Sequence, residues 1–142
     1  MKKQLIIALA FSISAFSFAQ KKELKTVEKA IKSNNFAEAK AAITQAESLL
    51  SVMDEKSKAK FYFLKGKALY ANGKGSIGDV DTAIESLAKA EGSYGTEIKE
   101  LKQTMTNGLL TTGNSAYEKK DYSLASKYFE KANPNTSTLT SC

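Results

Sequence analysis

The chain has 142 residues, with 21 basic and 15 acidic side chains and a formal net charge of +6. All of its basic residues are lysine, and it contains no histidine, arginine or tryptophan. This composition excludes Ser-His-Asp and Cys-His nucleophilic systems and the usual zinc ligand sets, so we expect no enzyme, no cofactor and no metal site. The lysines are interspersed with acids, which is typical of solvated helix surfaces rather than of a nucleic-acid interface.

The first 19 residues have the pattern of a secretory signal peptide. Lys2 and Lys3 give a positive start, an apolar run follows from Leu5 to Phe18, and small residues stand at positions 17 and 19. The pattern predicts cleavage between Ala19 and Gln20. The alternative is a membrane anchor, but the run is shorter than the roughly 20 residues needed to cross a bilayer. We therefore predict an exported protein, periplasmic or secreted, with no stable membrane anchor after cleavage.

The remaining chain alternates between helical periodicity and short breaks. Apolar residues recur three and four positions apart, which predicts helices. The expected helices cover residues 21–33, 36–53, 58–72, 80–91, 96–119 and 121–132. Pro134 ends the last helix, and residues 135–142 form a polar tail. Period-two alternation is absent, so the predicted fold is all-α, with six helices in three antiparallel pairs.

The glycine-rich stretch from Gly73 to Gly78 invites interpretation as a phosphate-binding loop. A Walker-type loop needs Gly-Lys-Ser/Thr in that order, after a strand; here Lys74-Gly75-Ser76 follows a predicted helix. We interpret it as a flexible connection. Asp79 and Asp81 lack the spacing of an EF-hand, and Asp79 is interpreted as a turn or capping residue.

The three helix pairs share a short sequence pattern. The second helix of each pair carries residues spaced by four and three, and a turn with an acid or amide precedes each set. The sets are Ala39, Ile43 and Ala46; Ala83, Leu87 and Ala90; and Ala125, Phe129 and Ala132. Gly66 and Gly113 stand on the first helices of the second and third pairs, where a small residue allows two helices to approach closely.

This pattern resembles the tetratricopeptide repeat (TPR), whose second helix reads Ala-x3-Phe-x2-Ala. The third repeat carries it best, with Gly113, Tyr117, Ala125, Phe129, Ala132 and Pro134. The resemblance implies a short right-handed solenoid over residues 20–134, with repeats at about 21–53, 58–91 and 96–133. A plain helical bundle without a groove is the alternative.

The resemblance also implies a concave groove lined by the first helices. The groove-facing residues would be Glu28 and Lys32 in repeat one, Phe63, Lys67 and Tyr70 in repeat two, and Leu110, Asn114, Tyr117 and Glu118 in repeat three. An aromatic residue beside lysine and an amide suits a peptide ligand. For Tyr70 and Tyr117, ordinary packing between helices is the alternative.

These observations predict a non-catalytic interaction or scaffold module of the bacterial cell envelope that binds a peptide or protein segment. A self-associating structural subunit and an envelope-glycan binder are the alternatives. No capping helix follows Ala132 in the sequence, so we expect further repeats or self-association at the C-terminal end. Cys142, the only cysteine, cannot form an internal disulfide.

Overall fold

The computed structural model describes the backbone of residues 2–133 and the side chains from residue 15 onward. It contains five α-helices, which are α1 (Lys2–Lys32), α2 (Phe36–Glu47), α3 (Glu55–Tyr70), α4 (Ile77–Glu118) and α5 (Tyr122–Ala132). Two 3-10 turns, Leu50–Val52 and Ala71–Gly73, connect α2 to α3 and α3 to α4. No strand occurs within residues 2–133, so the all-α prediction is confirmed. Pro134, the polar tail and Cys142 lie outside the described residues.

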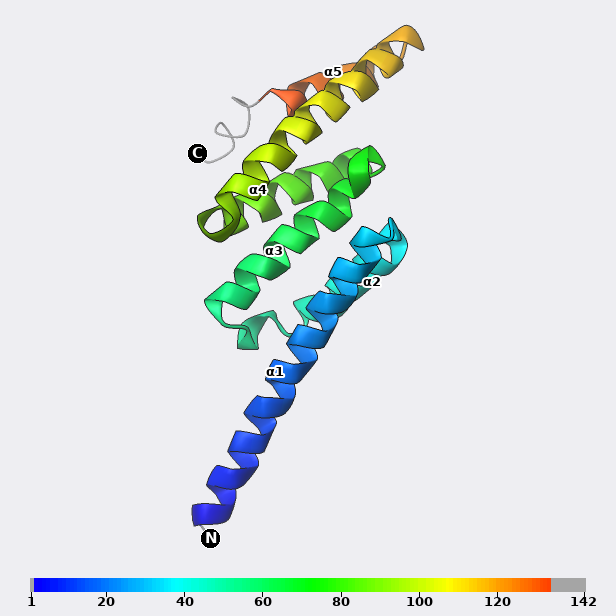
Figure 1. Ribbon diagram of the computed structural model, residues 1–142. Coiled ribbons are helices and arrows are strands. Elements are labelled where there is room, and N and C mark those ends of the chain that lie inside the picture. The colour runs from blue at the N-terminus through cyan, green and yellow to red at the C-terminus, as the bar shows by residue number, and fades with distance from the viewer. Residues whose placement is uncertain (1, 134–142) are drawn as a thin grey trace.

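The prediction of six helices is wrong in number because α4 joins two of them. Only Tyr94 leaves the helical region, with φ −128° and ψ 31°. The chain turns back there, and the two halves of α4 run in different directions (Figure 1). Lys102 Nζ lies 3.1 Å from Glu91 Oε1, although a continuous helix would separate these residues by roughly 16 Å along its axis. One residue, rather than a loop, makes the turn.

Helix α1 begins well before the expected position 21, since it extends through the predicted signal peptide. Its N-terminal half projects away from the other helices (Figure 1). Phe16 and Phe18 are 48% and 73% exposed, whereas Gln20 is only 6% exposed. Packing against the rest of the protein therefore begins at Gln20. Within residues 2–133, none of the helices combines the length and the apolar character needed to cross a membrane.

Helix α3 connects two halves of the core. The first cluster of buried side chains comes from α1, α2 and α3, and the second comes mainly from α4 with the end of α3. Tyr62 packs against both clusters. The largest side chains that are fully buried are Phe61, Leu87, Ile98, Val27 and Val80. Burial of this size is what stabilises short helices that would be marginal alone.

The turns that join α1 to α2 and α4 to α5 have the same backbone conformation. Asn34 and Lys120 adopt φ of 56° and 61°, and the residues after them, Asn35 and Asp121, have φ/ψ of −87°/76° and −86°/73°. The Asn35 N–H donates to the Ala30 carbonyl at 2.8 Å, and the Asp121 N–H donates to its counterpart, Ala116, at 3.0 Å. Both turns are Schellman motifs, in which a left-handed residue ends the helix. Asn35 and Asp121 then cap the next helix.

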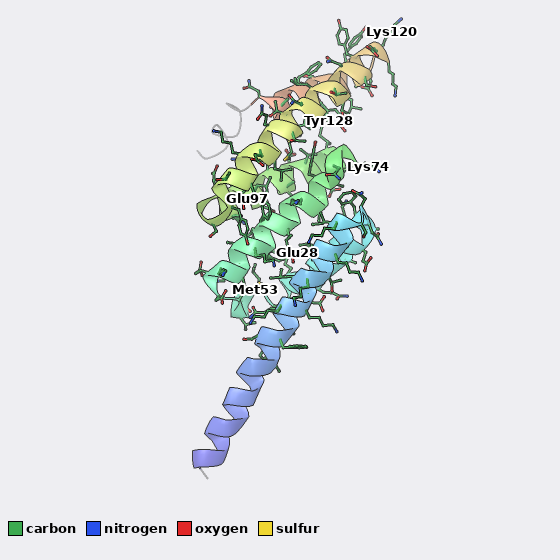
Figure 2. The ribbon with its side chains drawn as sticks, in the orientation of Figure 1. Glu28, Met53, Lys74, Glu97, Lys120 and Tyr128 are labelled. Atoms are coloured by element: carbon green, nitrogen blue, oxygen red, sulfur yellow. The ribbon has the colours of Figure 1, made fainter. Side chains whose placement is uncertain are left out.

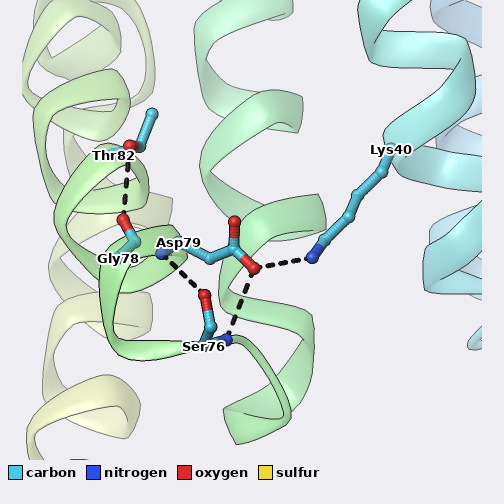
Figure 3. Close-up of polar contacts among 5 residues, drawn as sticks. All are labelled: Lys40, Ser76, Gly78, Asp79 and Thr82. Atoms are coloured by element: carbon cyan, nitrogen blue, oxygen red, sulfur yellow. Dashed lines mark hydrogen bonds and ion pairs between the residues drawn. The ribbon is translucent and has the colours of Figure 1, made fainter.

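Ion pairs connect residues that lie far apart in the chain. Lys60 on α3 reaches Glu28 on α1 at 3.1 Å, and Glu28 lies where α1 faces α3 (Figure 2). Lys40 on α2 reaches Asp79 on α4 at 2.7 Å (Figure 3). Asp81 also pairs with Lys131 of α5. The first half of α4 is therefore linked to α2 by one carboxylate and to α5 by another.

Candidate binding surfaces

One exposed surface lies on the second half of α4. Leu110, Asn114, Tyr117 and Glu118 recur at the spacing of one helix face, and all four are exposed. Leu110 is 42% exposed and Tyr117 is 59% exposed. The other side of the same helix is buried, at Met105, Leu109, Gly113 and Ala116. The predicted residues of repeat three therefore form a continuous row of accessible side chains, which we call the α4 row.

A shallow hollow of about 490 Å³ adjoins this row, between the ends of α4 and α5. It is lined by Tyr117, Tyr122, Ala125, Ser126, Phe129 and Glu130. The rings of Tyr117 and Tyr122 meet edge to face, with centroids 5.2 Å apart. Phe129 lies over Gly113, and a Cβ added at that glycine would come within 2.6 Å of its ring. The small residue at position 113 thus lets the aromatic ring lie directly against α4.

A second aromatic group lies on α3. Phe63 stacks on Tyr94 with centroids 4.6 Å apart and ring planes 3° from parallel. Lys67 Nζ lies 5.4 Å from the centroid of Phe63, a cation–π distance. All three side chains are half-buried, so each keeps some surface in contact with solvent. The structure thus brings two predicted residues, Phe63 and Lys67, together with Tyr94.

Tyr70 does not line an accessible groove. It is only 4% exposed, and its hydroxyl lies 2.6 Å from where a Cβ of Gly108 would be. Burial raises the pKa of its hydroxyl above the ordinary value. The packing alternative therefore describes Tyr70, because the long second half of α4 covers the end of α3.

The remaining predicted residues are separate from each other. Glu28 is occupied by its ion pair with Lys60, and Lys32 is exposed in the last turn of α1. Along α4, Leu110 follows Tyr94 by roughly 24 Å of helix axis at 1.5 Å per residue. The structure therefore divides the predicted site into the α4 row and the Phe63–Lys67 group, while Tyr70 at the end of α3 is buried against Gly108 of α4.

The polar group around Asp79 is structural. Ser76 caps α4, and its hydroxyl accepts from the Asp79 N–H at 3.1 Å, while an Asp79 carboxylate oxygen accepts from the Ser76 N–H (Figure 3). The hydrogen bond from Lys40 is the main cause that holds the pKa of Asp79 below its ordinary value. The same carboxylate oxygen of Asp79 accepts from Lys40 Nζ and from the Ser76 N–H, so it serves both the ion pair and the cap. In the part of the chain whose side chains are described, no three His, Cys, Asp or Glu side chains gather into a group able to hold a metal ion.

Sequence reasoning did not assign Tyr94, Tyr122 or Phe129 to a binding surface. Tyr94 stands between Gly92 and Gly95 at an expected turn, which gave no sign of its stacking on Phe63. Phe129 belongs to the repeat pattern, and Tyr122 directly follows the predicted break at Lys120–Asp121; neither position by itself predicts an exposed side chain. No sequence signal distinguishes these side chains from buried aromatic residues, because their exposure depends on which helices lie against them.

Comparison with known proteins gives no relative for this chain. No family model, curated protein or solved structure matches it significantly.

Proposed function

We propose that this protein is a non-catalytic interaction or scaffold module of the bacterial cell envelope, which binds a peptide or protein segment along α4. In this proposal the helices form three antiparallel pairs, α1–α2, α3 with the first half of α4, and the second half of α4 with α5. The pairs stack as a short right-handed solenoid of the TPR type, and their first helices line the concave side.

The stacking is supported by recurrence of the same local geometry. The turns at Asn34–Asn35 and Lys120–Asp121 share backbone angles and hydrogen bonds to within a few degrees and tenths of an ångström. Gly66 lies against Leu87, as Gly113 lies against Phe129, with the same 2.6 Å approach. Such equivalence is expected of repeated units, since each repeat buries its helices by the same packing.

The binding proposal rests on the α4 row. Exposed Leu110 and Tyr117 flank the exposed amide of Asn114, so the row offers apolar contact together with a hydrogen-bonding group. Tyrosine supplies contact area at a low cost in side-chain entropy, and an amide satisfies backbone groups of a bound segment. Apolar contact combined with hydrogen bonding is what a bound peptide segment requires, and this combination supports binding.

Export is the part of the proposal that concerns location. It is supported by the signal-peptide pattern and by the onset of burial at Gln20, next to the predicted cleavage point. Residues 20–133 would then form the packed body of the processed protein. A processed protein in the periplasm or outside the cell would carry its groove without a membrane anchor.

The experiment is a cross-linked pull-down from periplasmic extract with three versions of the full chain. The test variant is Asn114→Ala with Tyr117→Ala, and the matched control is Thr104→Ala with Ser115→Ala, exposed residues of the same helix that lie about 40–60° outside the arc of the α4 row at about 100° per residue. We expect the control to recover the proteins that the native chain recovers, and the test variant to lose them. Equal recovery by all three versions would show that the α4 row is not the binding surface.

Self-association is the second candidate, and the aromatic hollow favours it. Tyr122 is 56% exposed beside Tyr117, in a helix pair with no neighbour on that side among the described residues. This candidate predicts a mass that rises with concentration in ultracentrifugation and returns to the monomer in Tyr122→Lys. The envelope-glycan alternative has less support, because Tyr70, one of the tyrosines predicted to face the groove, is buried.

A further inference from the structure

The outward side of α1 carries a stripe of lysines. Lys21, Lys22, Lys25 and Lys29 are all exposed, and at about 100° per residue they occupy an arc of roughly 100° around the helix. Exposed Phe18 continues the arc toward the N-terminus. The opposite side of the helix is the packed one, at Gln20, Leu24 and Val27. We call this set of lysines, with Phe18, the α1 stripe.

The positive charge of this stripe is largely uncompensated. The lysines that form ion pairs among the described side chains are Lys40, Lys58, Lys60, Lys65, Lys102 and Lys131, none of which belongs to the stripe. Of the two acids on α1, Glu28 pairs with Lys60, and Glu23 lies about 100° outside the arc of the stripe. Lys21 does lie near enough to Asp54 to contribute to lowering its pKa. Lys22, Lys25 and Lys29 therefore face solvent with no acid partner.

Such an arrangement has a cost in the isolated protein. Lys21, Lys25 and Lys29 follow one another at four-residue intervals, where like charges repel and destabilise a helix. A negatively charged external surface would attract each of these lysines and so offset the repulsion between them. The stripe is thus a feature that stability alone does not explain.

We propose that the α1 stripe binds the anionic lipid headgroups of a membrane surface, reversibly and by electrostatic attraction. Lysine clusters on one side of a helix are attracted to anionic bilayers, with a strength that grows with each lysine near the surface. The stripe lies on α1, whose N-terminal half projects away from the other helices (Figure 1). The hollow that its lysines form with Phe18 and Thr26 is shallow. A flat, fluid surface matches that shape.

The chemistry of the side chains favours lipid over nucleic acid. Lysine is a compact point charge that suits a diffuse layer of headgroups, whereas arginine provides the planar, two-pronged contact used to recognise phosphates of a nucleic acid. The chain contains no arginine. Phe16 and Phe18, exposed at the end of the stripe, are side chains that an interfacial helix inserts between headgroups. Where the predicted cleavage removes them, the lysines remain.

This inference concerns a different surface from the proposed groove. The stripe is on α1, and the α4 row is at the other end of the helical body (Figure 1). A membrane held at α1 would leave the α4 row free. The two proposals can therefore fail independently.

Vesicle sedimentation of the full chain, in both unprocessed and processed forms, tests the inference. The vesicles contain either equal parts of phosphatidylglycerol and phosphatidylcholine or phosphatidylcholine alone. Salt is varied from about 0.01 M to about 1 M, over which the Debye length falls from roughly 30 Å to roughly 3 Å. We expect binding to the anionic vesicles alone, at low salt, and its loss at high salt.

The decisive variant is Lys22→Gln, Lys25→Gln and Lys29→Gln, which removes three charges from exposed positions and keeps good helix formers. The control, Lys74→Gln, Lys99→Gln and Lys119→Gln, removes the same charge from exposed positions elsewhere. We expect the stripe variant to bind roughly 100-fold more weakly, at about fivefold per lysine, and the control to change by about twofold or less. Circular dichroism should show equal helix content in all versions.

Four results would overturn the inference. The first three are equal weakening in the two triple variants, equal binding to vesicles without anionic lipid, and binding that persists at high salt. Binding that depends only on residues 1–19, with the stripe variant unaffected, would also overturn it, because the apolar run would then be the sole cause.

Discussion

The first and last helix pairs share a turn but differ in the surfaces they present. Both turns place a left-handed residue before a capping amide or acid, with matching hydrogen bonds. Yet the outward side of α1 is lined by lysines, whereas the outer side of the last pair carries Tyr117 and Tyr122. The turn determines how the two helices of a pair pack together, and the outward-facing residues determine which partners the pair can bind.

The same difference extends into the packing. Ile43 on α2 and Phe129 on α5 hold equivalent positions in the sequence pattern, but Ile43 is 4% exposed and Phe129 is half-buried. Ile43 has α3 as a further neighbour in its cluster, whereas Phe129 borders the hollow. Equivalent residues therefore contribute unequally to stability, and four predictions follow this contrast from the largest expected effect to the smallest.

Truncation of the smaller residue, Ile43, should destabilise the protein more than truncation of the larger one, Phe129. We expect Ile43→Ala to lower the free energy of unfolding by about 2–5 kcal/mol, because a fully buried aliphatic side chain leaves a cavity. Phe129→Ala should cost less, although phenylalanine is larger, because part of its ring is already in water. Urea denaturation followed by circular dichroism measures both. A larger loss at Phe129 would mean that its outer side is covered in solution.

Alanine substitution at the two close-packed glycines, Gly66 and Gly113, should lower the stability by different amounts. Gly66→Ala should cost about 1–3 kcal/mol, because the new Cβ would meet Leu87, which is fully buried, and the Ala83 carbonyl. Gly113→Ala should cost less, since Phe129 has room on the side of the hollow and alanine favours a helix by about 1 kcal/mol. Gly92→Ala is the control, with nothing within 4 Å of its Cβ. Equal costs at Gly66 and Gly113 would contradict the proposed freedom of Phe129.

A glycine substitution should stabilise the turn between α4 and α5 more than the turn between α1 and α2. Lys120 has φ of 61° at the tip of the last turn (Figure 2), a conformation that glycine adopts without strain. Lys120→Gly should raise the melting temperature, by a stabilisation of roughly 0.5–1 kcal/mol. Asn34→Gly should gain less, because asparagine tolerates the left-handed region. Lys119→Gly, where φ is −78°, should be destabilising and serves as the control.

The ion pair between α2 and α4 should make a small contribution that depends on pH. The pKa of Asp79 is lowered in the folded protein, chiefly by Lys40, so its carboxylate stabilises the fold above the unfolded pKa and this stabilisation is lost as the pH falls through the folded value. Asp79→Asn should cost at most about 1 kcal/mol at neutral pH, since solvent screens the partly exposed pair.

The measurement for Asp79 compares the unfolding free energies of the native and Asp79→Asn chains from about pH 7 to about pH 2. The difference should be constant above about pH 5 and should shrink toward zero at the acid end. Asp121→Asn, at a capping position without an ion pair to Lys40, is the comparison at the other end. A difference that stays constant throughout would show that Lys40 and Asp79 are not coupled.

The sequence predicted much of the fold because its signals are local. The breaks at Asn34–Asn35 and Lys120–Asp121 and the alanine spacing on α2 and α5 are local patterns. Most helix boundaries lie within about three residues of the expected positions; the start of α1 at Lys2 and the end of α2 at Glu47, instead of residue 53, do not. Tyr94 was harder. Gly92 and Gly95 indicated a turn, but the extent of helix on either side depends on contacts with α3, including the stacking of Tyr94 on Phe63.

The candidate site was less accessible to sequence reasoning. Leu110, Asn114 and Tyr117 share one face because of helical periodicity alone, which the sequence supplies. Whether that face is exposed depends on which helices lie against it. Tyr70 illustrates this limit of sequence reasoning. It follows Gly66 by four residues, as Tyr117 follows Gly113, yet the second half of α4 covers Tyr70 and leaves Tyr117 exposed.

By itself, the sequence determined the helical class, the turn residues, the absence of imidazole and guanidinium chemistry, and the repeated placement of small residues beside large ones. These features depend on neighbours within a turn or two of helix. Only the tertiary structure decided which of two equivalent tyrosines is buried and that six expected helices become five. It also decided which lysines find an acid and which remain free on α1. Those outcomes arise from segments far apart in the chain, whose packing no local pattern specifies.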